Sequence, residues 1–343
     1  MRELKGPWRI TFDTNPDDCN LSCIMCEDHS PFSSTQRERV QARIRRRRMP
    51  IELVHKIIAE AKPMGLREII PSTMGEPLLY KNFIEILNLC KKYEVKLNLT
   101  TNGTFPMKGA KTWAELIVPV TSDVKISWNG STKETQEKIM RGSQWDKVLG
   151  NIKDFIQIRD QFAKEGGNYC RITFQLTFMR ENVGELADII ELAAGVGVDR
   201  VKGHHLWAHF KEIEDSSIRQ NSQTISYWNV MVEKAYKVAE QKLLPNGKKI
   251  LLENIYPITS KLNQTYDGEC PFLGKEAWVA TDGRFNPCCA PDKERRSLGD
   301  FGNLNEKTLQ DIWMSSEYRQ LRANYQDYAV CQKCNMRKPK MDH

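Results

Sequence analysis

The sequence lacks the long apolar runs that membrane spans and secretion signals require. No stretch of its 343 residues approaches 18 apolar residues, and residues 1–9 are charged. It also lacks an internal repeat and a long low-complexity segment, while hydrophobic residues make up 40% and charged residues 28%. These absences exclude a membrane-spanning, solenoid or disordered protein. We therefore expect a globular protein of the cytoplasm with no membrane partner.

The sequence also lacks a large excess of one charge, because its net charge is only +7. Seven Arg within residues 37–48 carry much of that excess. Outside this run the basic balance is diffuse, which does not favour a nucleic-acid ligand. We interpret the Arg run as part of a loop or helix, where it is either solvated charge or a surface for an acidic leader peptide or partner protein.

Short β-type runs alternate with amphipathic stretches of helical length from Pro7 to about His209. This alternation predicts an α/β fold with a parallel sheet and crossover helices. Six βα units suit a partial (β/α)6 barrel whose active site lies at the carboxyl ends of its strands. The expected strands span residues 8–13, 67–72, 96–101, 123–128, 171–179 and 198–204, and the expected helices span residues 51–62, 81–93, 110–117, 144–162 and 183–196.

The composition of the sequence changes twice after the barrel region. Residues 1–215 form the predicted barrel, and a charged helical stretch within residues 216–262 forms a linker. Residues 263–343 are punctuated by Pro, Gly and Cys, which predicts a small Cys-rich domain.

Ten Cys in a long chain without an export signal indicate metal binding rather than disulfides. Cys19, Cys23 and Cys26 directly follow the first expected strand, separated by three and then two residues. Three thiolates can hold three irons of a 4Fe-4S cluster and leave the fourth iron open. Zinc with His29 as the fourth ligand is the alternative.

Cys270, Cys288, Cys331 and Cys334 form a second group, with 17 residues between the first two and two between the last two. Residues 278–288 predict a hairpin with its turn at 281–284, which brings the first two thiols near one another. A helix over residues 309–322 is expected to return the chain to the last two. Four thiolates suit an iron–sulfur cluster or a structural zinc ion.

Four further segments, read with the three-Cys motif, resemble the radical S-adenosylmethionine (SAM) superfamily. These are Met74-Gly75-Glu76-Pro77, Thr101-Asn102-Gly103, Ser127-Trp128-Asn129-Gly130 and Arg180-Glu181-Asn182. The resemblance implies that the open iron is chelated by SAM, and that one transferred electron cleaves SAM to a 5'-deoxyadenosyl radical. The SAM-binding residues that it implies are Met25, Gly75, Glu76, Pro77, Asn102, Ser127, Asn129 and Arg180.

The sequence departs from the family pattern at three of these positions. Met25 occupies a place that is usually aromatic, and an apolar replacement there should be tolerated. Met74 replaces a Gly, so the turn must not need a positive φ at that residue. Asn129 stands where Asp is more usual, which weakens any role that needs a carboxylate.

The C-terminal region resembles the twitch domain, a shortened relative of the SPASM domain that binds one auxiliary 4Fe-4S cluster through four Cys. The resemblance implies Cys270, Cys288, Cys331 and Cys334 as ligands, and its spacing favours Cys288 over the adjacent Cys289. We therefore expect two 4Fe-4S clusters, one that binds SAM and one auxiliary cluster.

The implied activity is hydrogen abstraction by the radical, with the electron supplied by an external one-electron donor. Residues 7–30 resemble maturases of ribosomally made peptides with Nif11-type leaders, a group that includes tyramine-excising spliceases. Because only 18 residues precede Cys19, we expect a separate small partner protein to recognise the leader of a precursor peptide. The alternative enzyme is a dehydrogenase or epimerase of an aminocyclitol or sugar. A non-catalytic scaffold would have no use for a three-Cys site with an open iron.

Three candidates for catalysis remain outside these motifs. His204 and His205 follow the sixth strand at the expected mouth of the barrel, in a cluster with His209. They suit substrate contact or proton transfer, or else are structural. Cys289 is the thiol that could donate a hydrogen atom.

Overall fold

The computed structural model describes residues 5–258, 268–334 and 336–337. The described residues form two compact units. Unit 1 comprises those within Met1–Pro16, Arg46–Asn98 and Gln264–His343, and unit 2 comprises those within Asp17–Arg45 and Leu99–Asn263. The chain therefore passes between the units more than once, whereas the three regions predicted from the sequence are consecutive segments. The sequence-based boundaries remain a prediction.

Unit 1 contains a sheet centred on β1 (Arg9–Phe12). β2 (Glu68–Ile70) and β8 (Glu276–Val279) both pair with β1 in parallel. β2 also pairs with the start of β3 (Lys96–Thr101), and β9 (Phe285–Asn286) pairs antiparallel with β8. The Arg9 side chain lies between its two register partners and bonds Glu68 at 3.2 Å and Glu276 at 3.0 Å. This cross-strand charge pairing fixes the register on both sides of β1.

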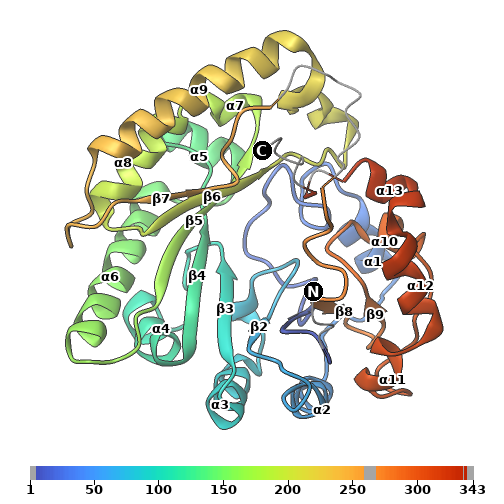
Figure 1. Ribbon diagram of the computed structural model, residues 1–343. Coiled ribbons are helices and arrows are strands. Elements are labelled where there is room, and N and C mark those ends of the chain that lie inside the picture. Colours follow the sequence, from blue (N-terminus) through green and yellow to red (C-terminus); the bar gives the residue numbers. More distant parts are fainter. Residues whose placement is uncertain (1–4, 259–267, 335, 338–343) are drawn as a thin grey trace. The chain divides into compact units, whose positions relative to one another are not determined.

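Unit 2 contains four parallel strands in the order β4 (Thr121–Ser127), β5 (Arg171–Phe178), β6 (Arg200–His205) and β7 (Leu251–Glu253), visible from teal to orange in Figure 1. Alternate residues point to opposite faces of each strand. In β5 the apolar set Ile172, Phe174, Leu176 and Phe178 is buried, while Gln175 and Thr177 lie on the opposite, polar face.

The crossover helices carry apolar stripes that cover these sheets. In unit 2, α8 and α9 lie side by side (Figure 1). The α-helices are α1 Thr35–Gln41, α2 Ile51–Ala61, α3 Phe83–Tyr93, α4 Ala110–Ile117, α5 Lys133–Ile139, α6 Trp145–Lys164, α7 Arg180–Val183, α8 Leu186–Val196, α9 Ser222–Gln241, α10 Asp292–Arg296, α11 Leu309–Trp313, α12 Ser316–Asn324 and α13 Ala329–Gln332. The 3-10 turns are η1 Pro77–Leu79, η2 Val118–Val120, η3 Lys211–Ser216, η4 Ile218–Gln220 and η5 Tyr325–Asp327.

The α/β class and the six predicted βα units are confirmed, with boundaries within two or three residues of those expected. The single helix predicted over residues 309–322 is wrong, because the chain forms α11 and α12 instead. Ser315 separates them, since its side chain accepts a hydrogen bond from the Tyr318 N–H and caps a new helix. Among the helices of the described residues, none has the length and apolar character needed to cross a bilayer.

Candidate functional site

The three-Cys loop lies in unit 2 and is held by the backbone at the end of α5 and just after it. The N–H of Ser22 donates to the Arg141 carbonyl at 2.9 Å, and that of Ile24 donates to the Ile139 carbonyl at 3.0 Å. Two alternate residues of the loop are thus bonded to the last residue of α5 and to the turn that follows it. These backbone hydrogen bonds determine the shape of the loop.

The loop also packs on an apolar cluster that belongs to unit 2. Cys19, Cys23, Met25 and Phe32 are half-buried against this cluster. Met25 thus contacts apolar neighbours, as an apolar residue at that position should. The buried members of the cluster are Leu21, Ile24, Ile139, Met140, Met179, Leu206 and Ile213.

The chemistry of the three thiols fits a cluster. Burial raises the pKa of Cys23, and negative charge at Cys26 and Cys19 raises it further, so the three sulfurs lie near one another. Backbone N–H groups also point at the sulfurs, from Leu21 to Cys19 Sγ at 3.5 Å and from His29 to Cys26 Sγ at 3.4 Å. Bound iron would remove the cost of gathering three thiolates, and N–H donors to sulfur tune such clusters. Among the described residues, no three His, Cys, Asp or Glu are arranged to hold a single metal ion.

Asn102, expected to bind SAM, is bonded to the Cys loop. Its amide N–H donates to Asn20 Oδ1 at 2.8 Å, and its own Oδ1 accepts from the Thr104 N–H at 3.0 Å. Asn20 lies between Cys19 and Ser22, so Asn102 positions the loop from the end of β3. Its contact with SAM remains a prediction.

Asn129 and Ser127 mark the carboxyl end of β4. Ser127 is the last residue of the strand and is half-buried. Asn129 is buried, and its Oδ1 accepts from the Thr177 N–H at 2.8 Å. The carbonyl of Asn129 accepts from Asn182 Nδ2 at 3.1 Å. Asn129 therefore joins the ends of β4 and β5, and a SAM contact from either residue remains a prediction.

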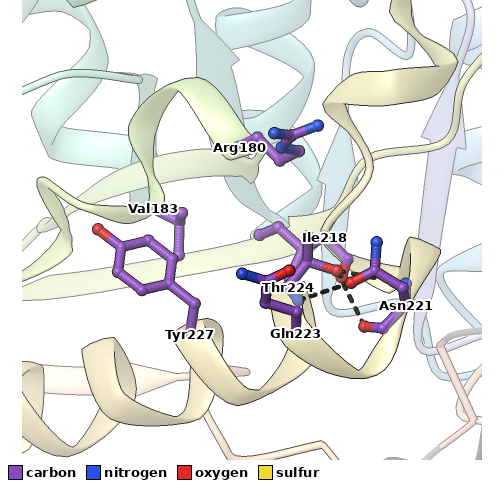
Figure 2. Close-up of a pocket in the computed structure, with 7 residues that line it drawn as sticks. All are labelled: Arg180, Val183, Ile218, Asn221, Gln223, Thr224 and Tyr227. Atoms are coloured by element: carbon purple, nitrogen blue, oxygen red, sulfur yellow. Dashed lines mark hydrogen bonds between the residues drawn. The ribbon is translucent and has the colours of Figure 1, made fainter.

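Arg180 lies at a cavity of about 340 Å³ formed by α7, η4 and the first turns of α9. Figure 2 shows it across that cavity from Asn221 and Thr224. Its guanidinium donates to the Asp215 carbonyl at 3.2 Å. None of the residues that line the cavity comes from the Cys loop, so a role for Arg180 in SAM binding remains a prediction.

His204 and His205 point to opposite faces of β6. His204 lies on the polar face, with Nδ1 3.3 Å from Gln175 Nε2 and Nε2 3.5 Å from Thr177 Oγ1. His204 is exposed to solvent, yet the protein atoms around its ring desolvate it, and this desolvation, followed by the charge of Lys202, lowers its pKa to about 4. It is therefore neutral at pH 7 and forms a neutral polar group with Gln175 and Thr177.

His205 is buried between the rings of Phe178 and Trp228. Desolvation, then the charges of Arg219 and His204, lower its pKa to about 3. This environment makes His205 part of the core behind the sheet. Of the two candidates, only His204 lies on the face that a substrate could reach.

The cations on the polar face below His204 are ion-paired. Arg200 pairs with Asp123 and with Glu253, and Lys202 pairs with Glu253 at 3.1 Å. These residues lie nearer the amino ends of the strands. The sequence analysis did not predict these ion pairs, because the pairing of the strands determines which charges meet.

In unit 1, residues 74–77 form the turn after β2. Gly75 has a φ of 77°, which favours Gly, whereas Met74 is not among the residues with positive φ, as its replacement of Gly requires. Glu76 is buried, and its Oε1 accepts from the Leu78 N–H at 3.2 Å while Pro77 begins η1. The Glu76 carbonyl accepts from Asn15 Nδ2 at 2.9 Å. A rigid turn thus holds a buried carboxylate in place.

The predicted hairpin is confirmed, because β8 and β9 pair with Val279 opposite Phe285. Burial raises the pKa of Cys288 to about 12, with added contributions from negative charge at Cys270, Cys331 and Cys334. The charge interactions place the other three thiols near Cys288, and a bound cluster would relieve the mutual repulsion of the four as thiolates. Cys289 is adjacent to Cys288 and, unlike the four predicted ligands, is exposed to solvent.

Two groups of positioning residues escaped the sequence analysis. Arg337 is buried and donates to the Gly268 carbonyl at 2.7 Å and the Cys331 carbonyl at 3.0 Å, so it joins the two ends of the C-terminal Cys group. Glu185 accepts from the Ser131 N–H at 2.6 Å, and hydrogen bonds hold the pKa of its carboxyl below the usual value even though burial alone would raise it. Neither has a sequence motif, although Arg337 lies three residues after Cys334.

Comparison with protein-family models gives two matches. The model of the radical SAM superfamily matches residues 16–193, which is more than half of the chain. The model of the SPASM iron–sulfur cluster-binding domain matches residues 270–335. The two matches include all seven Cys predicted as cluster ligands.

Among curated proteins, the tungsten-containing aldehyde ferredoxin oxidoreductase cofactor-modifying protein of Pyrococcus furiosus is 25% identical over 337 residues, covering 93% of this chain and 85% of that protein. A probable GTP 3',8-cyclase of Thermococcus kodakarensis is 22% identical, covering 79% of this chain and 81% of that protein.

Two solved structures have a similar fold. Streptococcus suis SuiB bound to precursor peptide SuiA has a TM-score of 0.66 at 17% identity, covering 96% of this chain and 71% of that chain. The protein anSMEcpe with bound AdoMet has a TM-score of 0.64 at 15% identity, covering 92% of this chain and 82% of that chain. At these identities the likeness concerns the fold.

Proposed function

Because the chain belongs to the radical SAM superfamily, we propose that it uses SAM and a 4Fe-4S cluster to modify a ribosomally synthesised precursor peptide. When bound, these groups supply a 5'-deoxyadenosyl radical that abstracts a hydrogen atom, and the protein supplies orientation and electrostatics. Excision of tyramine, as in spliceases, is one reaction of this class. A small partner protein would present the leader of the peptide.

The residues divide this work between them. Cys19, Cys23 and Cys26 would bind the first cluster, and Asn102 would hold their loop in shape through Asn20. Glu76 would accept hydrogen bonds from the ammonium group of SAM, since a fixed carboxylate binds a cation in a charge-assisted way. The four C-terminal Cys would bind the auxiliary cluster, which can take up or relay an electron.

The observation that best supports a peptide substrate is the neutral polar group at the carboxyl ends of β5 and β6. Gln175, Thr177 and His204 offer donors and acceptors without net charge, which suits the amide groups of a peptide backbone. Two residues beyond His204, Leu206 packs in the apolar cluster under the Cys loop. That SuiB was solved with a precursor peptide supports the same substrate class.

A second candidate substrate is a nucleotide or a heterocyclic cofactor precursor. It is favoured by the names of the two curated relatives, which match most of this chain. Against it, Arg200 and Lys202 on the polar face are already paired with carboxylates and are poorly placed to neutralise a triphosphate.

The test is a set of anaerobic reactions with reductant and SAM, each analysed by mass spectrometry. Separate reactions contain a candidate precursor peptide with and without a candidate partner protein, GTP, and an aminocyclitol. A mass change in the peptide supports the proposal, and turnover of GTP or of the aminocyclitol alone contradicts it. His204→Gln should slow peptide turnover and spare 5'-deoxyadenosine formation without substrate.

A further inference from the structure

The short helix α1 lies on the surface without a core of its own. None of its seven residues is buried, and Ser34 at its N-terminus makes no side-chain cap. Val40 is 74% exposed and Ile44, just beyond the helix, is 53% exposed. Helices this short are marginal in water unless something packs on them. The exposed side of residues 35–45, here called the basic segment, is therefore available to a partner.

The basic segment is strongly cationic. Residues 35–45 contain four Arg and one acidic residue, Glu38. Arg37, Arg43 and Arg45 are exposed, and the exposed aliphatic residues Val40 and Ile44 lie between them in the sequence. Arginine around exposed apolar side chains is typical of protein interfaces, and the sign of the charge calls for an acidic partner.

The basic segment is also attached to the three-Cys loop within unit 2. Arg39 forms an ion pair with Asp17 at 3.0 Å, and Gln36 Nε2 donates to the same carboxylate at 3.2 Å. Asp17 is buried and lies two residues before Cys19. On the other side of the loop, Phe32 packs in the same apolar cluster as Cys19. The residues on both sides of the loop thus connect the three Cys to the basic segment.

We propose that the basic segment docks an acidic one-electron carrier protein that reduces the site formed by Cys19, Cys23 and Cys26. The carrier loses one electron and the site gains it, with no bond made or broken. The proposal rests on the radical chemistry of the proposed function but not on its peptide substrate. Electron transfer slows steeply with distance, so a carrier needs a surface attached to the acceptor, whereas a leader peptide has no such requirement. Small, charge-steered interfaces are usual for redox encounters.

The experiment compares two reductants on cluster-loaded enzyme. The carrier probe is a purified acidic flavodoxin in its reduced state, and the small-molecule control is dithionite, which needs no docking surface. The test variant is Arg37→Gln/Arg43→Gln/Arg45→Gln. The matched control is Lys147→Gln/Lys153→Gln/Lys164→Gln on the exposed side of α6, which removes the same charge elsewhere.

The Arg variant should bind flavodoxin about tenfold more slowly at low salt, as measured by stopped-flow fluorescence, and the difference should shrink at high salt because screening removes steering. Flavodoxin-driven SAM cleavage should fall with it, while dithionite-driven cleavage stays within twofold. The Lys variant should match the unmodified protein in every assay.

Equal flavodoxin binding by the Arg and Lys variants would overturn the proposal. A second result would also overturn it: a Glu-rich 20-residue peptide binds the Arg variant more weakly than the unmodified protein, while flavodoxin binds both equally. The surface would then be a peptide site. If the Arg variant loses iron, Val40→Ser/Ile44→Ser decides, since it leaves the charges and the Asp17 anchor intact and should weaken flavodoxin binding. Absence of SAM cleavage with either reductant would contradict the proposed function, while flavodoxin binding would still report on docking.

Discussion

Glu76 is a buried carboxylate in a turn whose backbone is fixed on both sides. Its Oε1 accepts from the Leu78 N–H and its carbonyl accepts from Asn15. If the carboxylate binds the SAM ammonium, Glu76→Gln removes the charge but keeps an oxygen for Leu78. Loss of a charge-assisted hydrogen bond costs about 1.5–3 kcal/mol, so the Kd for SAM should rise about 10- to 100-fold in anaerobic calorimetry.

The Glu76→Ala variant separates binding from stability. It lacks the acceptor for Leu78 and should lose about 1 kcal/mol of unfolding free energy without SAM, whereas Glu76→Gln should unfold like the unmodified protein. If Glu76→Gln binds SAM with unchanged affinity, the turn has been assigned the wrong role.

His205 makes stability depend on acid. Its pKa of about 3 in the folded protein lies below the ordinary value of 6.5, so the unfolded chain binds a proton first as the pH falls. The stabilisation is complete above pH 6.5 and is lost progressively between pH 6.5 and 3. Between pH 7.5 and 5.5 this single group should cost about 1.4 kcal/mol.

The His205→Phe variant tests this acid dependence, because Phe fits the aromatic site beside Phe178 and Trp228 and does not titrate. Denaturant unfolding at the two pH values should show a smaller loss of free energy for the variant, by about 1.4 kcal/mol. An identical loss in both proteins would mean that His205 binds its proton equally well in the folded and unfolded states.

At the scale of elements, the turn between β8 and β9 determines where Cys288 lies. Gly283 has a φ of 87°, and a Cβ there would meet Asn305 Nδ2 at 2.3 Å and Asn303 Oδ1 at 2.6 Å. Both Asn side chains donate to the Asp282 carbonyl and cannot move away freely. Gly283→Ala should therefore cost about 1–3 kcal/mol and reduce the iron held by the C-terminal Cys.

Gly150→Ala is the matched control for the turn. Gly150 lies inside α6, and no atom beyond the backbone of its own helix lies within 4 Å of the position that a methyl group would take. Ala should therefore be neutral there or stabilise by up to about 1 kcal/mol. Iron content measured on both variants, relative to protein, distinguishes the turn from a general effect of replacing Gly. Full iron content in Gly283→Ala would show that the hairpin tolerates the extra carbon.

The sequence predicted the elements whose pattern is local. Each crossover helix shows its apolar stripe, and the hairpin turn shows its Asp-Gly pair. The pairing of β8 with β1 was not predictable in this way, because it joins segments more than 260 residues apart through backbone bonds and the Arg9–Glu276 contact. β7 has only three residues and carries too short a pattern to be recognised.

The same distinction holds in the candidate site. Cys spacing is visible in the sequence, so candidate cluster ligands could be named. The partners that hold those ligands could not, since Asn20 meets Asn102 and Arg337 meets Gly268 only after folding. The sequence also could not show which of His204 and His205 lies on the polar face, because that face is defined only by the pairing of β5 with β6.

At the scale of the whole molecule, the two Cys groups belong to different compact units. Cys19, Cys23 and Cys26 lie in unit 2, whereas the four C-terminal Cys lie in unit 1. Each group has its own set of backbone and side-chain anchors. We therefore expect either cluster to survive the loss of the other.

Cys19→Ala/Cys23→Ala/Cys26→Ala is the variant that tests this independence. Two 4Fe-4S clusters give about eight irons per chain, so the variant should retain about four, with the absorption of the auxiliary cluster and no SAM cleavage. Cys90→Ala/Cys170→Ala, which removes two buried thiols outside both groups, should keep about eight irons because neither thiol is a predicted ligand. Iron analysis after anaerobic reconstitution measures both. Unchanged iron in the triple variant would refute the first site. Zinc in place of the remaining iron, with no acid-labile sulfide, would refute the second site, because a single zinc ion binds thiolates without sulfide.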